Sequence, residues 1–253
     1  MSIHNEEESK DQNPSSVTRR KFLKNSGYVV GGAILGGIVG NLLGRPVQEN
    51  NPSQAAGPTT DYNQALMFFT IEQFRTVEAA TERIFPADEI GPGAKDLGVA
   101  YFIDHQLSGD WGFNARDYMQ GPFYKGEAVQ GYQGRLKRRE IFDIALQEMN
   151  NYSRSKYQKR FYELTGEQQD EVLTAFQNDE VKITTISPSG FFNTLRTATI
   201  QGVYADPLYG GNRNMDGWKM KNFPGNQMAY TDIIEDEKLA KIPPKSLKDH
   251  VQH

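Results

Sequence analysis

Cysteine is absent from this chain of 253 residues. A chain without thiols forms no disulfides and attaches no c-type haem covalently. It also lacks the ligands of iron–sulfur clusters and of thiolate zinc sites, and it cannot carry thioester-linked lipids. If the protein takes part in electron transfer, a partner must therefore hold the redox centre.

Histidine is scarce as well, with four in the chain. His4 lies near the N-terminus, and His250 and His253 lie near the C-terminus, so only His105 falls inside a predicted folded element. No second histidine stands at metal-ligand spacing from it. We interpret His105 as a surface or capping residue of a helix rather than a ligand or a base.

The chain has no large excess of positive charge, since its formal net charge is -4. A nucleic-acid-binding protein would need a basic face. The basic cluster Arg135–Arg139 is interpreted as the exposed side of a helix rather than a phosphate site.

Catalytic motifs are missing too, because no Walker loop, G-x-S-x-G or H-E-x-x-H occurs. Several carboxylates offer material for a paired acid–base site, although solvated helix-surface charges are the stronger interpretation. They are Glu78, Glu82, Asp88, Glu89, Asp96 and Asp104.

What the chain does contain is an elaborate start. A basic block at 18–24 precedes an uncharged, glycine-rich run at 28–44. The run has about seventeen residues, fewer than the roughly twenty that span a bilayer as a helix, and its glycines lower helix propensity. A basic region before a modest apolar run is typical of an export signal. The glycines make a poor nucleotide loop, because no strand-to-helix unit frames them.

The basic block resembles the twin-arginine export consensus. The residues that carry this resemblance are Arg19, Arg20, Phe22 and Leu23. We interpret residues 1–45 as a twin-arginine signal or an N-terminal anchor, and cleavage stays open. The twin-arginine translocase moves proteins already folded in the cytoplasm. The signal therefore predicts a location on the outer face of the cytoplasmic membrane, in the periplasm or in the cell wall space.

After this start, polar turn-forming residues between Asn50 and Asp61 indicate a linker over 46–61, so a folded domain is predicted over 62–253. Apolar residues at helical spacing predict a mostly α fold, because no stretch shows strand alternation. Thr70 with Gln73 forms a capping box for the first helix, which Pro86 ends. Further helices are predicted over Val99–Leu107, Arg135–Tyr152, Lys156–Leu164, Thr165–Phe176 and Ser189–Val203.

Two long loops, rich in aromatic residues and glycine, interrupt this compact helical domain at 108–134 and after Val203. Loops of such length are unusual unless they are functional. The second loop carries Tyr209, Trp218 and Phe223, which suit a protein interface. They would equally serve to pack the loop over the domain's own core, and both interpretations stay open.

One family resembles these blocks. The stretch "LMFFTIEQFRTVEAATERIFPADEIGPGAKDLGVAYFIDHQLSG" is similar to the start of the gluconate 2-dehydrogenase subunit 3 family. Its members typically show a P-x-D turn, here Pro86–Asp88, a G-P-G-A step, here Gly91–Ala94, and a helix ending like Ile103–Leu107. Residues 121–133 and 206–225 resemble the middle and C-terminal blocks of that family. The resemblance covers roughly residues 62–230.

The resemblance implies partners. In that family the small subunit accompanies a large flavoprotein of the glucose–methanol–choline type, which holds FAD and oxidises a sugar or sugar acid. In many members a multihaem cytochrome c subunit passes the electrons on. The flavoprotein usually lacks its own export signal, so the small subunit would escort it and stabilise its fold. The chain itself would hold no cofactor, no metal and no catalytic residue.

The candidate partner interface comes from the C-terminal block. Its residues are Tyr209, Gly210, Gly211, Asn212, Trp218, Phe223, Pro224 and Gly225. Two alternatives belong to other classes. One is a solitary membrane-tethered protein whose Tyr209–Gly225 loop captures a small ligand or polymer. The other is an autonomous enzyme that uses a carboxylate pair near Asp88 and Asp104.

Overall fold

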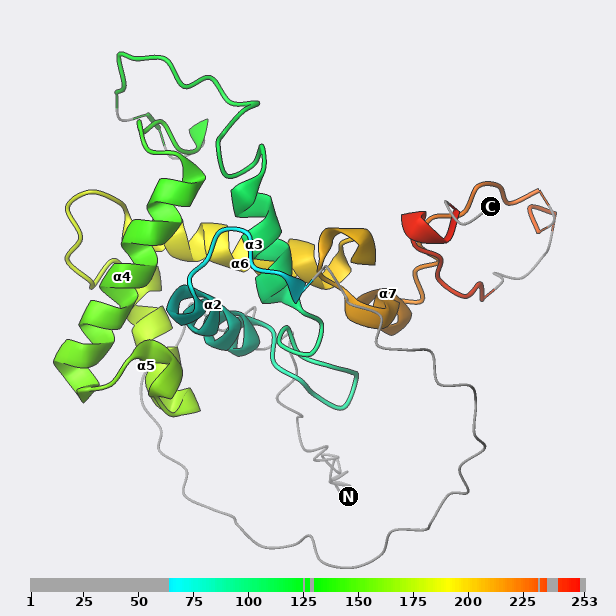
Figure 1. Cartoon of the computed structure of the whole chain (residues 1–253), viewed down its shortest axis with the longest axis horizontal. Coiled ribbons are helices and arrows are strands. Elements are labelled where there is room, and N and C mark those ends of the chain that lie inside the picture. Colours follow the sequence, from blue (N-terminus) through cyan, green and yellow to red (C-terminus); the bar gives the residue numbers. More distant parts are fainter. Residues whose placement is uncertain (1–63, 125, 128–129, 232, 236–240, 251–253) are drawn as a thin grey trace, which may run out of the picture.

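The computed structural model describes residues 64–124, 126–127, 130–231, 233–235 and 241–250. The predicted signal, 1–45, and linker, 46–61, lie outside these residues. Across the described ranges the chain forms α-helices joined by loops and short 3-10 turns, with no strand (Figure 1), which confirms the mostly α fold. The helices are α2 (Ile71–Ile84), α3 (Val99–Ser108), α4 (Arg138–Tyr157), α5 (Gly166–Gln177), α6 (Pro188–Tyr204) and α7 (Asp216–Met220).

Two of the helices, α2 and α5, begin at threonine capping boxes. The backbone N–H of Gln73 donates to the Thr70 hydroxyl, and the Gln73 side chain accepts from the Thr70 backbone, which completes the predicted capping box of α2. Thr165 and Gln168 cap α5 in the same way. These boxes satisfy N–H groups that a helix start otherwise leaves without partners.

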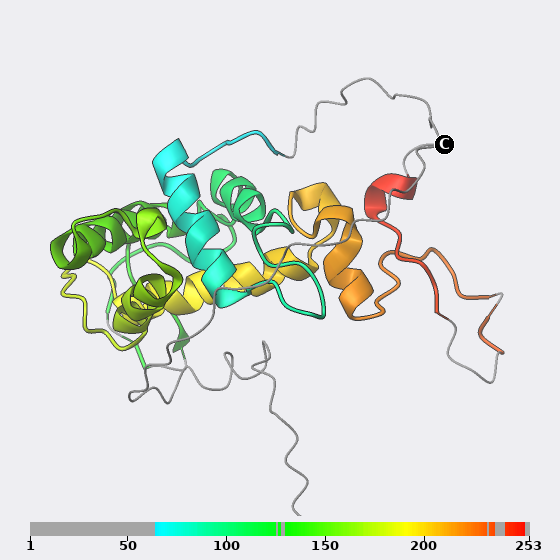
Figure 2. The ribbon, with the colours of Figure 1, turned by 90° about the horizontal axis from the view of Figure 1, so that it is seen from below.

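Helix α6 is the centre of the packing, because it contacts α2, α3, α4, α5 and α7. Figure 2 shows it running along the length of the helical body. Its Phe191 ring packs edge-on against Phe142 of α4, with 5.2 Å between centroids, and against Phe176 of α5 at 6.0 Å. All three rings are buried, and edge-to-face pairs add stability beyond the area they bury. The neighbouring Phe192 is buried as well.

Two predicted helix assignments need correction. Helix α4 runs over Arg138–Tyr157 rather than Arg135–Tyr152, and the separate helix predicted over Lys156–Leu164 is wrong. The chain instead turns at Gln158, which has a left-handed φ of 61°, and forms the 3-10 turn Phe161–Glu163. A hydrogen bond explains the turn, since the backbone N–H of Phe161 donates to the Asn150 side chain at 3.0 Å.

The basic cluster at the start of α4 holds the first long loop in place. Arg138 forms an ion pair with Asp117 at 2.7 Å, and its backbone N–H donates to the Asn114 side chain. The Arg139 guanidinium lies over the Phe113 ring, 4.2 Å from its centroid. Arg138 and Arg139 are therefore half-buried against the loop rather than on a plain solvent-exposed helix side.

Asn150 provides a test of this fold. Its amide also donates to the Thr76 hydroxyl of α2 at 3.2 Å, so one buried side chain joins α2, α4 and the turn after α4. We expect Asn150→Ala to lower the free energy of unfolding by about 1–3 kcal/mol, because it leaves the buried Phe161 N–H without an acceptor. Urea denaturation followed by circular dichroism measures the change. The control is Asn151→Ala on the exposed side of the same helix; an equal loss in both variants would contradict the assigned role.

Candidate partner-binding surface

The second long loop folds back onto the helices as a C-terminal block, residues Asp206–Gly225. The indole N–H of Trp218 donates to the Tyr204 carbonyl at the end of α6, at 2.8 Å. The fully buried Asn212 side chain accepts from the Gly217 backbone and donates to the Ala205 carbonyl, both at 2.8 Å. These bonds tie the block to the end of α6.

Glycines let this block approach α6 closely. A Cβ atom on Gly211 would lie 2.2 Å from the Gly202 carbonyl oxygen of α6, and one on Gly217 would lie 2.0 Å from the Val203 carbonyl oxygen. Real Cβ atoms do not reach such distances, so backbone meets backbone there and no other residue fits. The packing explains why this part of the sequence is rich in glycine.

The predicted interface residues fall into three groups by their exposure. Gly211, Asn212 and Trp218 are buried within the fold, so they position the block rather than present themselves to another molecule. Tyr209 and Phe223 are about half exposed, at 48% and 49%. Three further residues are partly buried: Gly210, Pro224 and Gly225. Contact with a partner stays a prediction, and within the C-terminal block Tyr209 and Phe223 are the large side chains best placed for it.

A further anchor, which the sequence analysis missed, joins the block to the last part of the chain. The Asp206 carboxylate accepts from the Ser246 hydroxyl at 2.6 Å and from the Leu247 backbone N–H at 2.8 Å. We call this set of bonds the clamp. The S-x-x-D spacing of Ser246 and Asp249 was a sequence signal for a turn there, and the Ser246 N–H does donate to Asp249. Nothing local indicated that Asp206 would be the partner.

Four of the six carboxylates that offered an acid–base site bind groups within the fold, and Asp104 is the clearest case. Asp104 is fully buried and accepts three backbone N–H bonds, from Met67 at 2.6 Å, Phe68 at 3.1 Å and Phe69 at 2.6 Å. It thereby holds the segment before α2 against α3. Asp88 accepts from the Ile90 backbone within its own turn. Both oxygens of the Asp104 carboxylate are therefore occupied by backbone N–H groups, which argues against an acid–base pair of Asp88 and Asp104.

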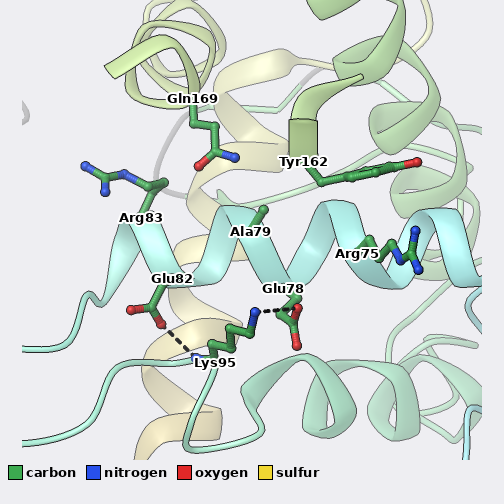
Figure 3. Close-up of a pocket in the computed structure, with 8 residues that line it drawn as sticks. All are labelled: Arg75, Glu78, Ala79, Glu82, Arg83, Lys95, Tyr162 and Gln169. Carbon is green, nitrogen blue, oxygen red and sulfur yellow. Dashed lines mark hydrogen bonds and ion pairs between the residues drawn. The ribbon is translucent and has the colours of Figure 1, made fainter. Parts of the chain in front are cut away.

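One hollow of about 450 Å³ lies beside α2 (Figure 3), and its charges are also in use. Glu82 accepts from the backbone of Ala87 and of Lys95, while the Lys95 ammonium pairs with Glu78 at 3.5 Å. Arg83 reaches outward to Asp170 of α5 in a two-bond contact, which raises the pKa of the guanidinium. The hollow is thus lined by groups that join α2 to its neighbours.

His105 lies between the segment before α2 and the C-terminal block. The His105 ring lies at a hydrogen-bond distance of 3.0 Å from the Ala65 carbonyl, and Gly210 packs against its other nitrogen. No cluster of three or more metal-ligating side chains occurs in the described part of the chain. A helix long and apolar enough to cross a membrane is likewise not found among those residues. The run at 28–44 lies outside them.

A model described as gluconate 2-dehydrogenase subunit 3 matches residues 71–225, more than half of the chain. This chain belongs to the gluconate 2-dehydrogenase subunit 3 family. The predicted resemblance is confirmed, and the family's name places its members in a multi-subunit dehydrogenase complex. No curated protein and no solved structure matches the chain.

The family match leaves out the last part of this subunit 3 chain. It ends at Gly225, where the C-terminal block ends. The clamp residues Ser246 and Leu247 lie beyond the match, although they fasten onto Asp206 inside it. The segment 226–244, which we call the arm, is the part between.

The role of Asp104 is open to direct measurement. Replacing it in Asp104→Asn puts an amide N–H₂ where three backbone N–H groups need acceptors, so we expect a loss of about 2–3 kcal/mol in the free energy of unfolding. Thermal unfolding monitors the change, and Asp96→Asn, at an exposed position, is the control. An Asp104→Asn variant of unchanged stability would revive a chemical role for this carboxylate.

The close approach of the C-terminal block makes a second prediction. Gly211→Ala should destabilise the protein by about 1–3 kcal/mol, because the methyl group forces the block away from α6. The matched control is Gly109→Ala, where the nearest atom to an added Cβ is 3.6 Å away. Denaturant titration of both variants, followed by Trp fluorescence, would refute the close packing if they behaved alike.

Proposed function

We propose that this protein is the non-catalytic small subunit of an exported FAD-dependent dehydrogenase of the glucose–methanol–choline type. It escorts the flavoprotein subunit through the twin-arginine translocase and stabilises it. The flavoprotein oxidises a sugar or sugar acid, and a cytochrome c subunit takes the electrons where one is present. The complex works on the outer face of the cytoplasmic membrane, in the periplasm or in the cell wall space.

Membership of the subunit 3 family carries this proposal. The chemistry of the chain supports it from another side. With no cysteine the chain has no thiolate for a redox centre, and its buried carboxylate Asp104 is taken up by backbone hydrogen bonds. An escort needs a stable body, an exposed docking surface and an address.

The proposed docking surface lies near the first residues that the structure describes. The described chain begins beside α3, where Ala65 accepts from His105, and the same imidazole packs against Gly210 of the C-terminal block. Tyr209 is the residue directly before Gly210 in the chain. A partner docked on Tyr209 and Phe223 would thus sit close to the segment that leads back to the signal.

Stabilisation follows from mass action. A subunit that binds only the folded flavoprotein raises the free energy of unfolding of that partner as its own concentration rises above the dissociation constant. Because the twin-arginine route takes folded cargo, a complex assembled in the cytoplasm would pass with its FAD already in place. The substrate would be set by the flavoprotein.

The address is tested by the double change Arg19→Lys with Arg20→Lys, which keeps the positive charge. We expect both this chain and dehydrogenase activity to disappear from the exported fraction and to collect in the cytoplasm. Cell fractionation with immunoblotting and a flavin spectrum measures both. The control, Lys21→Arg with Lys24→Arg, alters the same block without touching the pair and should leave export intact.

The outcome separates the candidate functions. Export of an active flavoprotein from a strain that lacks this gene would refute the escort role. A purified chain that turned over substrate with no second subunit would support the autonomous enzyme instead. Export of this chain with no flavoprotein bound would point to the solitary binding protein.

A further inference from the structure

We propose that the start of α4, together with the part of the first long loop that packs on it, is a membrane-facing surface that binds anionic phospholipid headgroups. This surface, which we call the loop face, consists of residues 110–118 and 130–139, all of which the structure describes. The inference goes beyond the proposed function and rests on it only for the location at the outer face of the cytoplasmic membrane.

Hydrogen bonds make the loop face a fixed surface. Besides the two bonds of Arg138 to the loop, the backbone N–H of Arg139 donates to the Gly112 carbonyl at 3.2 Å. The Tyr132 hydroxyl accepts from the Leu136 backbone N–H at 3.0 Å, which ties the end of the loop to the residues before α4. The side chains of the loop face are therefore positioned before a ligand binds.

Cations of the loop face lie on aromatic rings. The Arg139 guanidinium contacts two of them, 4.9 Å from the Phe68 centroid and 4.2 Å from the Phe113 centroid. The Lys137 ammonium lies 5.6 Å from the same Phe113 centroid. Cation–π attraction holds these charges beside apolar surface. Such a pair suits the boundary of a bilayer, where a ring enters the interface while the cation stays among the phosphates.

The exposed large apolar side chains of the loop face are all aromatic. Tyr118 is 82% exposed, Tyr132 53% and Phe113 44%. Aromatic residues gather at membrane–water interfaces because their rings and polar edges match the headgroup region. Figures 1 and 2 show the described parts of the first long loop away from α7, so these rings are not covered by the C-terminal block.

The loop face is positive, although the chain as a whole has a formal net charge of -4. Its two stretches hold five cations and two carboxylates, Asp110 and Asp117, and Asp117 is taken up by Arg138. Four cations form no ion pair with any described residue: Arg116, Arg135, Lys137 and Arg139. They are available to anionic headgroups, each of which adds binding free energy when it meets a cation near the bilayer surface.

Neighbouring carboxylates do not remove this positive charge. Between the two stretches the sequence adds one cation and one carboxylate, Lys125 and Glu127, which cancel. The next two carboxylates of α4 accept hydrogen bonds elsewhere, Glu140 from the Lys137 backbone and Asp143 from the Gln73 side chain. The loop face thus keeps an excess of cations.

A membrane is the occupant that these features fit. A second copy of this chain would bring the same cations together across a two-fold contact. The candidate contact with the flavoprotein, Tyr209 and Phe223, belongs to the C-terminal block instead. The chain also enters the described body at this face, because Phe68, which packs on Arg139, lies four residues after Gln64, the first described residue. The chain that leads back to the predicted signal or anchor therefore leaves the body beside the loop face.

The test measures binding of the full chain to vesicles by co-sedimentation. The vesicles contain phosphatidylglycerol with phosphatidylethanolamine, or phosphatidylcholine alone. We expect Arg135→Gln with Lys137→Gln to weaken binding to the anionic vesicles by about tenfold or more, because two cations leave the bilayer surface. Added salt should weaken wild-type binding to the same vesicles. Tyr118→Ser should weaken it too, since a ring leaves the interface.

Matched controls remove the same groups elsewhere. Lys182→Gln with Lys241→Gln takes two exposed cations from other parts of the surface, and Tyr230→Ser takes an exposed tyrosine from the arm. Every variant keeps the basic block at 18–24 and the run at 28–44, so any lipid binding by these residues is the same throughout. The controls should bind as the wild type does, and circular dichroism should show all variants folded.

Each outcome decides the question. If the loop-face variants and their controls bind anionic vesicles alike, the loop face is not the membrane contact and the inference is wrong. If the loop-face variants keep vesicle binding but lose the flavoprotein in a pull-down, the surface is a protein contact and the inference is wrong as well. Neither result touches the proposed function, which fails only if the native chain carries no flavoprotein.

Discussion

The contact of backbone against backbone at the end of α6 is the constraint on which the remaining structure depends. Gly202 on the helix and Gly211 in the C-terminal block leave no space for a side chain between them. The Trp218 indole, bonded to the Tyr204 carbonyl, closes the same contact from the other side. Because this packing is so close, the block that follows cannot shift without opening α6. The position of Asp206, and with it the clamp to Ser246, depends on that contact.

Polar groups in this protein act mainly as internal fasteners. Asp104 accepts hydrogen bonds from the backbone N–H groups of Met67–Phe69. Asn150 joins two helices to a turn, and Arg83 joins α2 to α5. Each satisfies hydrogen-bonding groups that burial would otherwise leave at a cost. Among the residues that suggested acid–base chemistry, Asp104, Glu82 and Asp88 instead accept backbone hydrogen bonds that position loops on the helical body.

The exposed features have a different distribution. Within the helices most large apolar side chains face inward, with Ile71 at the start of α2 an exception, whereas the loops keep several of theirs in water. The exposed apolar side chains therefore lie mainly in the loops. The family match, over residues 71–225, covers the helices and the C-terminal block.

Local patterns were enough to predict the capping box at Thr70, the mostly α fold and the family blocks, because each depends on residues a few positions apart. They failed after Tyr152, where helical spacing predicted a new helix and the Asn150–Phe161 bond made a turn instead. Long-range pairs were beyond any local pattern: Asp104 with Met67, and Asp206 with Ser246, 40 residues apart. The sequence around a carboxylate does not show whether its side chain is solvated or buried. Only the folding of distant segments onto one another decided that these serve as anchors.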